Sequence, residues 1–414
     1  MKLEERGHYS PKQIGFRPSR STCDLLAILT QKWCDALDQA GSVLLVTLDI
    51  AKAFDRVWHA GLKCKFPAFG VCDKLSTWIS NYLDDRNQSV VIDGCSSHSL
   101  PISAGVPQGS VLGPTLFLMF INDITSTCRN PLYLFADDNT LFRVIRSDET
   151  LESATTELQN DLNSLAQWTD DWNARFNPTK CEVLLITRKH FTEPLKPLKI
   201  YDQQIPVVNS LRLLGMRINS TLCFDEHIQN LSVRGSRALG SLCRASRYLR
   251  IHNRTILYKS LVRSTIEYGC PIWGGAAQKW VGKLDTIQNR AIKLLKIKDP
   301  LKHNVISLEL RRKTASMLLF RKHLFHPPDL GRFQELITTL FDKLITTIQF
   351  NLFDLELLNI VTRLFHVFID CGIPFHSMWP PQSMKSASMK RYSLLSLFTC
   401  YATYFRHLST MFSE

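Results

Sequence analysis

A chain of 414 residues, 45% of them hydrophobic and 21% charged, is long enough for two or three globular domains. Its formal net charge of +13 predicts an acidic partner, for which nucleic acid is favoured over an anionic membrane. The chain contains no uncharged run that could cross a bilayer, no apolar signal-peptide core near its start, and no Cys/His spacing typical of zinc among its 12 cysteines. We therefore expect a protein with reduced thiols in the cytoplasm or nucleus, neither secreted nor bound to a membrane.

The first elements expected along the chain are a basic turn and a helix. Residues 14–22 are rich in turn formers, and Arg17 and Arg20 within them are read with equal weight as phosphate contacts or as surface charges. Over Cys23–Leu37, leucine and tryptophan recur at helical spacing, and Ser21 or Thr22 is a suitable N-cap.

A buried strand is predicted next. Ser42–Leu48 is a continuous apolar run, which is typical of a strand covered on both faces, and Asp49 ends it. The pattern then turns helical. An aspartate in this place is as often a helix cap as a functional carboxylate, whereas Asp55 is expected to be structural.

The region that follows predicts a helix over Leu75–Leu83, a strand and turn over Ser89–Gly94, and then a glycine-rich loop, Gly105–Pro114. Glycines and prolines around Gln108 make a backbone that can approach a ligand closely, although an ordinary turn has the same composition. An apolar helix is expected over Thr115–Ile124.

Two adjacent acids lie at the centre of the next pattern, Leu132–Phe142, which reads as strand, tight turn and strand. Like charges at the end of a buried hairpin are costly unless a cation neutralises them, and oxygen ligands suit Mg²⁺. On this evidence alone, a metal site at Asp137 and Asp138 is about as probable as a structural turn. The other two Asp-Asp pairs, at 84–85 and 170–171, lie among polar residues and read as solvated surface.

A long amphipathic helix is then expected from Leu151 to Trp172, with a stop by Asn177-Pro178. Lys180 follows, and strands are predicted over Cys181–Thr187 and through Leu211–Met216.

The positive charge is concentrated beyond these strands. Residues 231–323 contain 20 Lys and Arg against four acids, a net charge of +16, so the rest of the chain sums to −3. A helix running through this segment to Arg254 would have leucines on one side and arginines on the other, and no acid occurs between Asn230 and Thr265. A phosphate-facing surface is therefore favoured over a plainly solvated or membrane-bound one. The arginines are Arg234, Arg237, Arg244, Arg247, Arg250 and Arg254.

Together these pieces resemble the reverse transcriptases of non-LTR (LINE-type) retrotransposons, in the style of the jockey elements. The resemblance covers about residues 10–325. Motifs A to C in their order are highly specific, although any one alone is weak. The matching stretches are Gln13–Pro18 ahead of the palm, Leu48–Asp55 for motif A, Gly105–Pro114 for motif B, Phe135–Asp138 for motif C, Asn177–Lys180 for motif D, and the following strand at Leu211–Met216.

The resemblance implies a role for each matched position. Asp49, Asp137 and Asp138, with the Ile50 carbonyl, would hold two Mg²⁺ ions, or Mn²⁺ in their place, for nucleotidyl transfer to a primer 3′-hydroxyl. Lys180 would donate a proton to the leaving pyrophosphate. The remaining residues would contact substrate: Phe54 would exclude the ribose 2′-hydroxyl and so select dNTPs, Gln108 and Gly109 would touch the nucleotide or the template, and Arg17 would also belong to the substrate site.

The implied fold class is α+β. It consists of a right-hand polymerase palm, a ferredoxin-like antiparallel sheet with helices, together with partial fingers and a basic helical thumb that grips the RNA template and DNA primer. We expect a reverse transcriptase domain at 1–219, a thumb-like region at 220–325, and a tail of uncertain fold and without a motif at 326–414.

The chain also departs from the family pattern. The family carries more fingers sequence ahead of Gly15, and the jockey-like elements carry an endonuclease upstream, so we expect an N-terminally truncated part of a larger reading frame. Asn139 stands where a threonine or small residue often follows the two acids. The alternative function is a catalytically inactive nucleic-acid-binding remnant of such an element. A third reading, a domesticated protein acting through its tail, has the least support.

Overall fold

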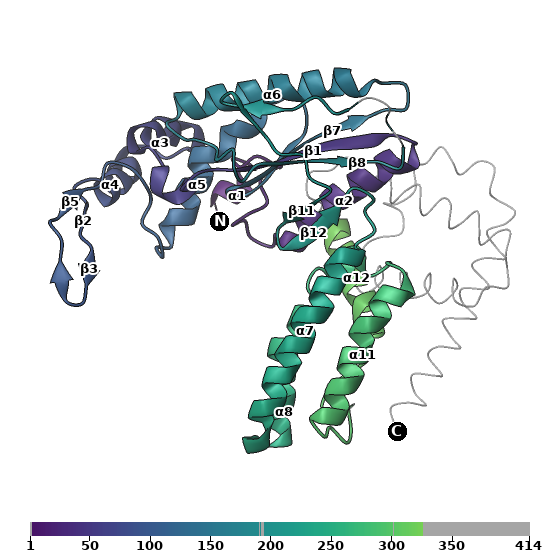
Figure 1. Cartoon of the computed structure of the whole chain (residues 1–414). Helices are drawn as coiled ribbons and strands as arrows, with labels where there is room; N and C mark the ends of the chain where they lie inside the picture. Colours follow the sequence, from purple (N-terminus) through teal and green to yellow (C-terminus); the bar gives the residue numbers. More distant parts are fainter. Residues whose placement is uncertain (1, 190, 192–193, 301, 326–414) are drawn as a thin grey trace, which may run out of the picture. The chain divides into compact units, whose positions relative to one another are not determined.

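The computed structural model describes residues 2–189, 191, 194–300 and 302–325 (Figure 1). The chain divides into two units between Leu330 and Gly331, and all described residues belong to the first. The expected sheet region and the expected basic helices thus share one unit, and the boundary at 219/220 stays a prediction. The tail, 326–414, lies outside the described residues.

A four-stranded antiparallel sheet, in the order β6-β7-β1-β8, forms the centre of the described unit. The strand predicted over Ser42–Leu48 is confirmed as β1. Four of its residues, 43–46, have no exposed surface. The predicted hairpin is confirmed as well. The strands are β1 (Ser42–Asp49), β6 (Leu132–Phe135), β7 (Asp138–Ile145) and β8 (Glu182–Ile186).

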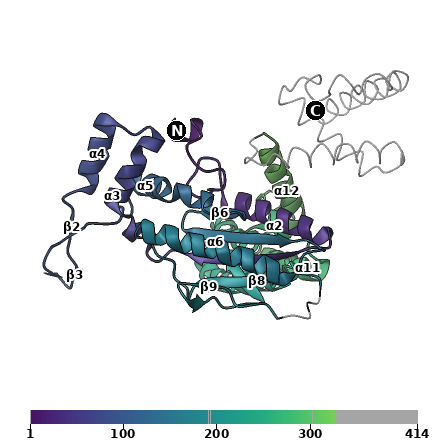
Figure 2. The ribbon, with the colours of Figure 1, turned by 90° about the horizontal axis from the view of Figure 1, so that it is seen from above.

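Helices cover both faces of this sheet, which is why four consecutive residues of β1, Val43 to Val46, are apolar rather than alternating with polar ones. Figure 1 shows α6 (Leu151–Asp171) on one side of the strands and α2 (Thr22–Asp38) on the other, and Figure 2 shows α6 crossing over them. Leu44 and Val46 pack into the core that contains the apolar side of α6 and of α5 (Leu112–Ile121), while Val43 and Leu45 pack into the core of α2.

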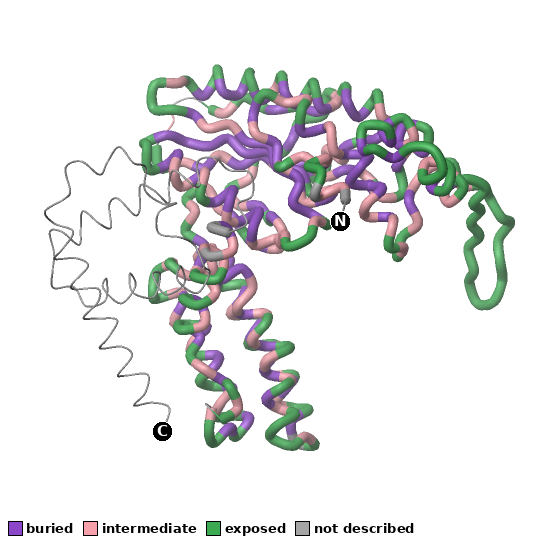
Figure 3. The backbone as a smooth tube through the Cα atoms, turned by 180° about the vertical axis from the view of Figure 1, so that it is seen from behind, coloured by how far each residue is buried: buried purple, intermediate pink, exposed green. Residues whose placement is uncertain are grey.

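A segment rich in short elements connects β1 to α5. It contains a hairpin over residues 87–101, built from two pairs of two-residue strands and exposed along its whole length. Figure 3 shows this hairpin extending away from the sheet. The helix expected over residues 75–83 is confirmed. The elements are η1 (Ala53–Arg56), α3 (His59–Lys65), η2 (Phe66–Phe69), α4 (Asp73–Leu83), β2 (Asn87–Gln88), β3 (Val91–Ile92), β4 (Cys95–Ser96) and β5 (Leu100–Pro101).

Two sequence predictions are wrong in the region after β8. The single strand expected through residues 211–216 is a hairpin, β11 (Ser210–Leu213) and β12 (Met216–Asn219), whose two turn residues, Leu214 and Gly215, both have positive φ. The long basic helix ends early: α7 (Asp225–Ala245) gives way to the turn η4 (Ser246–Tyr248), and α8 (Ile251–Leu257) is a separate helix.

Helices α7 and α11 (Gln278–Leu294) pack side by side. None of the described helices is both long and apolar enough to cross a membrane. The structure combines helices with antiparallel sheets, as the α+β prediction requires. The remaining elements are α1 (Lys2–Glu5), η3 (Asn122–Ser126), β9 (Lys199–Ile200), β10 (Gln203–Gln204), the π-helical η5 (Tyr258–Arg263), α9 (Ser264–Ile266), α10 (Cys270–Trp273) and α12 (Leu308–Phe325).

Candidate active site

The three acids singled out in the sequence meet at one end of the central sheet. Asp49, the last residue of β1, pairs in register with Asp138, the first residue of β7. Residues directly opposite each other on antiparallel strands have Cβ atoms about 5 Å apart. Asp137 occupies the two-residue turn between β6 and β7, so the carboxylates come from positions 88 residues apart in the chain.

The protein raises the proton affinity of two of these acids. Displacement of water around its carboxyl group raises the pKa of Asp138 to about 6, and the charges of Asp137 and Asp49 add to the increase. Burial likewise raises the pKa of Asp137, with a further contribution from Asp49, while Lys180 acts in the opposite direction. The fold therefore holds these carboxylates where their negative charges are costly, and a bound cation would offset that cost.

Lys180 is brought to the same point by a turn. Asn177 donates its backbone N–H to the Asp49 carbonyl, 2.8 Å away, and its side-chain oxygen accepts hydrogen bonds from Thr179. The turn places Lys180 Nζ 3.3 Å from Asp49 Oδ2. That oxygen is buried and accepts no hydrogen bond, so the ammonium neutralises it by charge alone.

The donor set suits a hard divalent cation. All three side chains offer carboxylate oxygens, and one of these oxygens is buried without a hydrogen bond. Within the described residues, no three Asp, Glu, His or Cys side chains already converge as ligands of one point. The Ile50 carbonyl, on a buried residue that bridges to Phe176, is a further oxygen in this neighbourhood.

Phe54 lies in the short turn that follows β1. Its ring stacks on Phe117 of α5, with centroids 4.5 Å apart, and meets the exposed Phe16 edge to face at 6.0 Å. The ring is half-buried, so one part packs against the core while another stays accessible.

The glycine-rich loop is attached to the same turn. Val106 donates its N–H to the Phe54 carbonyl and Gly105 to that of Val57, each at 2.8 Å. The exposed Gln108 donates from Nε2 to Asp55 Oδ1 at 2.8 Å, and Gly109 beside it is also exposed. Asp55, expected to be structural, therefore orients Gln108.

Arg17 is engaged elsewhere. It forms an ion pair with Glu4 at 2.6 Å and donates to the carbonyls of Ser10 and Gln13. Only 9% of its side chain is exposed. These contacts favour neither of the two readings of Arg17, as a phosphate contact or as a solvated surface charge. We leave Arg17 out of the proposed site.

Asn139 has a positioning role that the sequence did not signal. It is 1% exposed, and its amide donates to the carbonyl of Asp137 at 2.8 Å and towards that of Leu48 at 3.4 Å. The residue that looked like a tolerated departure thus ties the acid turn to β1.

The arginines of the basic segment do not form one row. Arg234, Arg237 and Arg244 lie exposed on one side of α7, and none of these three forms an ion pair with any described carboxylate. Arg250 precedes α8. Arg254 turns back to donate to the Leu249 carbonyl at 2.8 Å, so its expected phosphate contact lacks support. Arg247 lies in η4, and its side chain is outside the described set.

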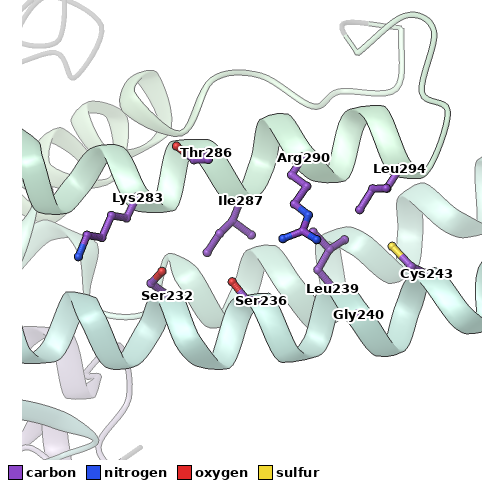
Figure 4. Close-up of a pocket in the computed structure, with 10 residues that line it drawn as sticks. All are labelled: Ser232, Ser236, Leu239, Gly240, Cys243, Lys283, Thr286, Ile287, Arg290 and Leu294. Carbon is purple, nitrogen blue, oxygen red and sulfur yellow. The ribbon is translucent and has the colours of Figure 1, made fainter.

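Two hollows border α7. One, of about 200 Å³, lies between the β11–β12 hairpin and the start of α7, and two arginines outside the predicted set line it: Arg212, and Arg217, which forms an ion pair with Glu226 at 3.0 Å. The other, of about 400 Å³, is a groove between α7 and α11 into which Lys283 and Arg290 point (Figure 4). Its lining includes none of the sequence-predicted site residues.

Comparison with known proteins identifies the family of this chain. A family model described as reverse transcriptase (RNA-dependent DNA polymerase) matches residues 1–218, more than half of the chain. This chain belongs to the reverse transcriptase family. The resemblance drawn from the motifs is thereby confirmed.

Relatives in the reverse transcriptase family include polymerases of mobile elements. The RNA-directed DNA polymerase from mobile element jockey of Drosophila melanogaster is 30% identical over 296 residues, 68% of this chain and 31% of that protein. A probable RNA-directed DNA polymerase from transposon X-element of the same species is 28% identical over 307 residues, 71% of this chain and 32% of that protein. The chain thus spans about a third of the length of the curated relatives it matches.

Among solved structures, apo telomerase from Candida tropicalis is similar with a TM-score of 0.41 and 12% identity, covering 72% of this chain and 48% of that one. Telomerase from Candida albicans, in complex with a fragment of telomeric RNA, gives a TM-score of 0.39 at 11% identity over 70% of this chain and 54% of that one.

Proposed function

We propose that this chain is an RNA-directed DNA polymerase that extends a primer 3′-hydroxyl with dNTPs on an RNA template. The observation that carries the proposal is the register of β1 and β7, which sets Asp49 opposite Asp138 beside the Asp137 turn. In this proposal the sheet is the palm, the segment around α3 and α4 belongs to the fingers, and α7 to α11 form the thumb.

Asp49, Asp137 and Asp138, with the Ile50 carbonyl, would hold two Mg²⁺ ions, or Mn²⁺. Such ions, when bound, supply charge stabilisation and lower the pKa of the primer hydroxyl. The protein's own part is to hold the three carboxylates together at one end of the sheet. Lys180, whose Nζ lies 3.3 Å from Asp49 Oδ2, would give a proton to the leaving pyrophosphate.

Phe54 and Gln108 would form the nucleotide side of the site. The stack on Phe117 fixes the Phe54 ring, which would then exclude a ribose 2′-hydroxyl, and the hydrogen bond to Asp55 orients the Gln108 amide. Gly109 leaves the backbone beside Gln108 open to a base or sugar.

Arg234, Arg237 and Arg244, extended by Arg212, would contact the phosphates of the template–primer duplex without reading its sequence. An inactive remnant would need the same basic surface but has no physical use for three crowded carboxylates. The intact acids therefore favour the enzyme.

Primer extension tests the proposal. The full chain, with an oligo-dT primer on a poly(A)-containing RNA and Mg²⁺ or Mn²⁺, is expected to incorporate dNTPs. Binding of the duplex without any extension would instead support the inactive remnant.

Replacing Phe54 with alanine is expected to let ribonucleotides in. Loss of the ring removes the steric exclusion of the 2′-hydroxyl, so the preference for dNTP over rNTP should fall by roughly 10–200-fold, the range of small steric discriminations. The ratio of kcat/KM values, measured on one preparation, is insensitive to partial loss of folded protein. An unchanged ratio contradicts the role, and Phe16→Ala, which alters the exposed neighbouring ring, is the matched control.

Removing the α7 charges is expected to weaken duplex binding and to reduce its salt dependence. With Arg234, Arg237 and Arg244 changed to glutamine, the slope of log K against log salt should decrease in magnitude by about three, one for each lost phosphate contact. A control triple, Lys63, Arg188 and Lys196 to glutamine, makes the same change in net charge at exposed ion pairs elsewhere. Equal slopes for the two triples would argue against an α7 interface.

A further inference from the structure

The segment ahead of α2 runs beside the strand that leads into the acid turn. Ile14 donates its N–H to the Leu134 carbonyl at 2.8 Å, and Leu134 donates to that of Lys12 at 2.9 Å, so Gln13 bridges to β6 in parallel. Gln13 has no exposed surface. It therefore cannot touch a nucleotide or a nucleic acid strand.

The side chain of Gln13 reaches the acid turn directly. Its Oε1 accepts one hydrogen bond from the N–H of Gly15, at 2.9 Å, and a second from the N–H of Ala136, at 3.0 Å. Ala136 immediately precedes Asp137 and has a φ of +58°, a left-handed conformation that is costly for any residue with a Cβ. A specific contact at that N–H is what can hold such a conformation in place.

Gly15 allows this contact. A Cβ atom at Gly15 would lie 2.4 Å from the Ala136 nitrogen, so the two backbones touch and no side chain fits between them. The acid turn therefore packs directly against the backbone of Gly15, and its Ala136 N–H is hydrogen-bonded to Gln13.

The unused half of the amide points to the same conclusion. Gln13 Nε2 is buried and has no hydrogen-bond partner within the described structure. A buried amide donor without a partner destabilises a fold, and an apolar side chain of similar size would avoid that cost. Core packing therefore does not explain a glutamine here, whereas the need for an acceptor at Ala136 does.

We propose that Gln13 is a positioning residue for the acids: its Oε1 fixes the left-handed turn at Ala136 and so the direction in which Asp137 and Asp138 present their carboxylates. This inference rests on the proposed function, because it concerns the geometry of the same cation site.

The test compares Gln13→Leu, which removes the acceptor, with Gln13→Glu, which keeps an oxygen in its place. Two quantities are measured: the Mg²⁺ concentration that gives half of the maximal rise in melting temperature, which needs no activity, and kcat for primer extension. In Gln13→Leu, half-saturation should move to roughly 10–100-fold higher Mg²⁺ and kcat should fall by a similar factor, the usual effect of losing an outer contact of a metal site. Duplex affinity should be unchanged. Gln13→Glu should lie closer to wild type.

Leu26→Ala is the matched control. Leu26 is a fully buried residue of α2, so its loss disturbs the core without removing a hydrogen bond to the acid turn. Wild-type Mg²⁺ dependence in Gln13→Leu, an equal shift in Leu26→Ala, or a Gln13→Glu protein as impaired as Gln13→Leu would each overturn the inference. If Gln13→Leu does not fold, Gln13→Asn, whose oxygen falls short of Ala136, serves in its place. Failure of the wild-type chain to extend primers would count against the proposed polymerase and leave the Mg²⁺ comparison intact.

Discussion

Asp138→Asn is expected to abolish primer extension while making the metal-free protein more stable. The amide cannot supply the negative charge that a divalent cation needs, and loss of several kcal/mol of charge stabilisation corresponds to a rate decrease of roughly a thousandfold or more. Extension at the wild-type rate would contradict the metal assignment.

The gain in stability follows from the cost of a charged Asp138 carboxylate in the fold, which partial burial and then the charges of Asp137 and Asp49 increase. The pKa of Asp138 is about 6 in the folded protein, above its ordinary value of 3.8. Between these two values the folded chain holds a proton that the unfolded chain has released, so stability falls as pH rises through this window. Asp138→Asn removes that dependence. Its melting temperature in EDTA should exceed that of wild type at pH 7.5 and match it near pH 4.

Addition of Mg²⁺ should reverse the order at pH 7.5, because only the wild-type protein gains a ligand for its clustered charge. Asp170→Asn is the control. It removes one charge from an exposed Asp-Asp pair on α6, and neither extension nor the response to Mg²⁺ should change.

Asp24→Ala is expected to have the largest effect on folding. Asp24 in α2 is completely buried, yet it forms ion pairs with Lys322 at 2.5 Å and with His323 at 2.8 Å, both from α12. Burial alone would raise its pKa, but the hydrogen bonds from His323, Lys322 and Ser21 outweigh burial and hold the pKa well below its usual range. This contact joins segments almost 300 residues apart and attaches α12 to the layer behind the sheet.

Removing one partner of a buried charged cluster costs about 3–5 kcal/mol, and the partial exposure of Lys322 favours the lower end. Denaturant unfolding monitored by tryptophan fluorescence would measure the loss. Because the folded-state pKa of Asp24 is lowered, its contribution is present above the ordinary pKa of aspartate and disappears as pH falls below that value. The difference between wild type and Asp24→Ala should therefore shrink in acid.

Glu309→Gln provides the comparison, since Glu309 lies on α12, the helix that carries the partners of Asp24. Glu309 forms an exposed ion pair with Lys313, one turn further along α12, and such pairs contribute little because solvent screens them. No measurable change is expected. A destabilisation equal to that of Asp24→Ala would show that loss of any ion pair involving α12, buried or exposed, has this effect.

The sequence determined the elements whose signals are local. The apolar run of β1, the hairpin carrying Asp137 and Asp138, and the helices α2 and α6 follow from hydrophobic period and turn chemistry within a few residues. The motif order also indicated the family, and it assigned Asp49 and Lys180 to the same site as the acid pair.

The tertiary structure decided which of these residues meet. The register that sets Asp49 against Asp138, the approach of Lys180, and the contact of Gln13 with Ala136 depend on pairing between distant segments. Such pairing is set by the shared core on both faces of the sheet and has no counterpart in a local pattern.

The errors have the same origin. The hairpin at 210–219 places Leu214 in a left-handed turn that leucine rarely adopts, so the sequence read as one strand. The basic helix ends at Ala245 without a glycine or proline to mark the stop. Local propensity determined whether a segment forms a helix, a strand or a turn. Packing between distant segments, which local propensity does not encode, determined which segments pair and where each one ends.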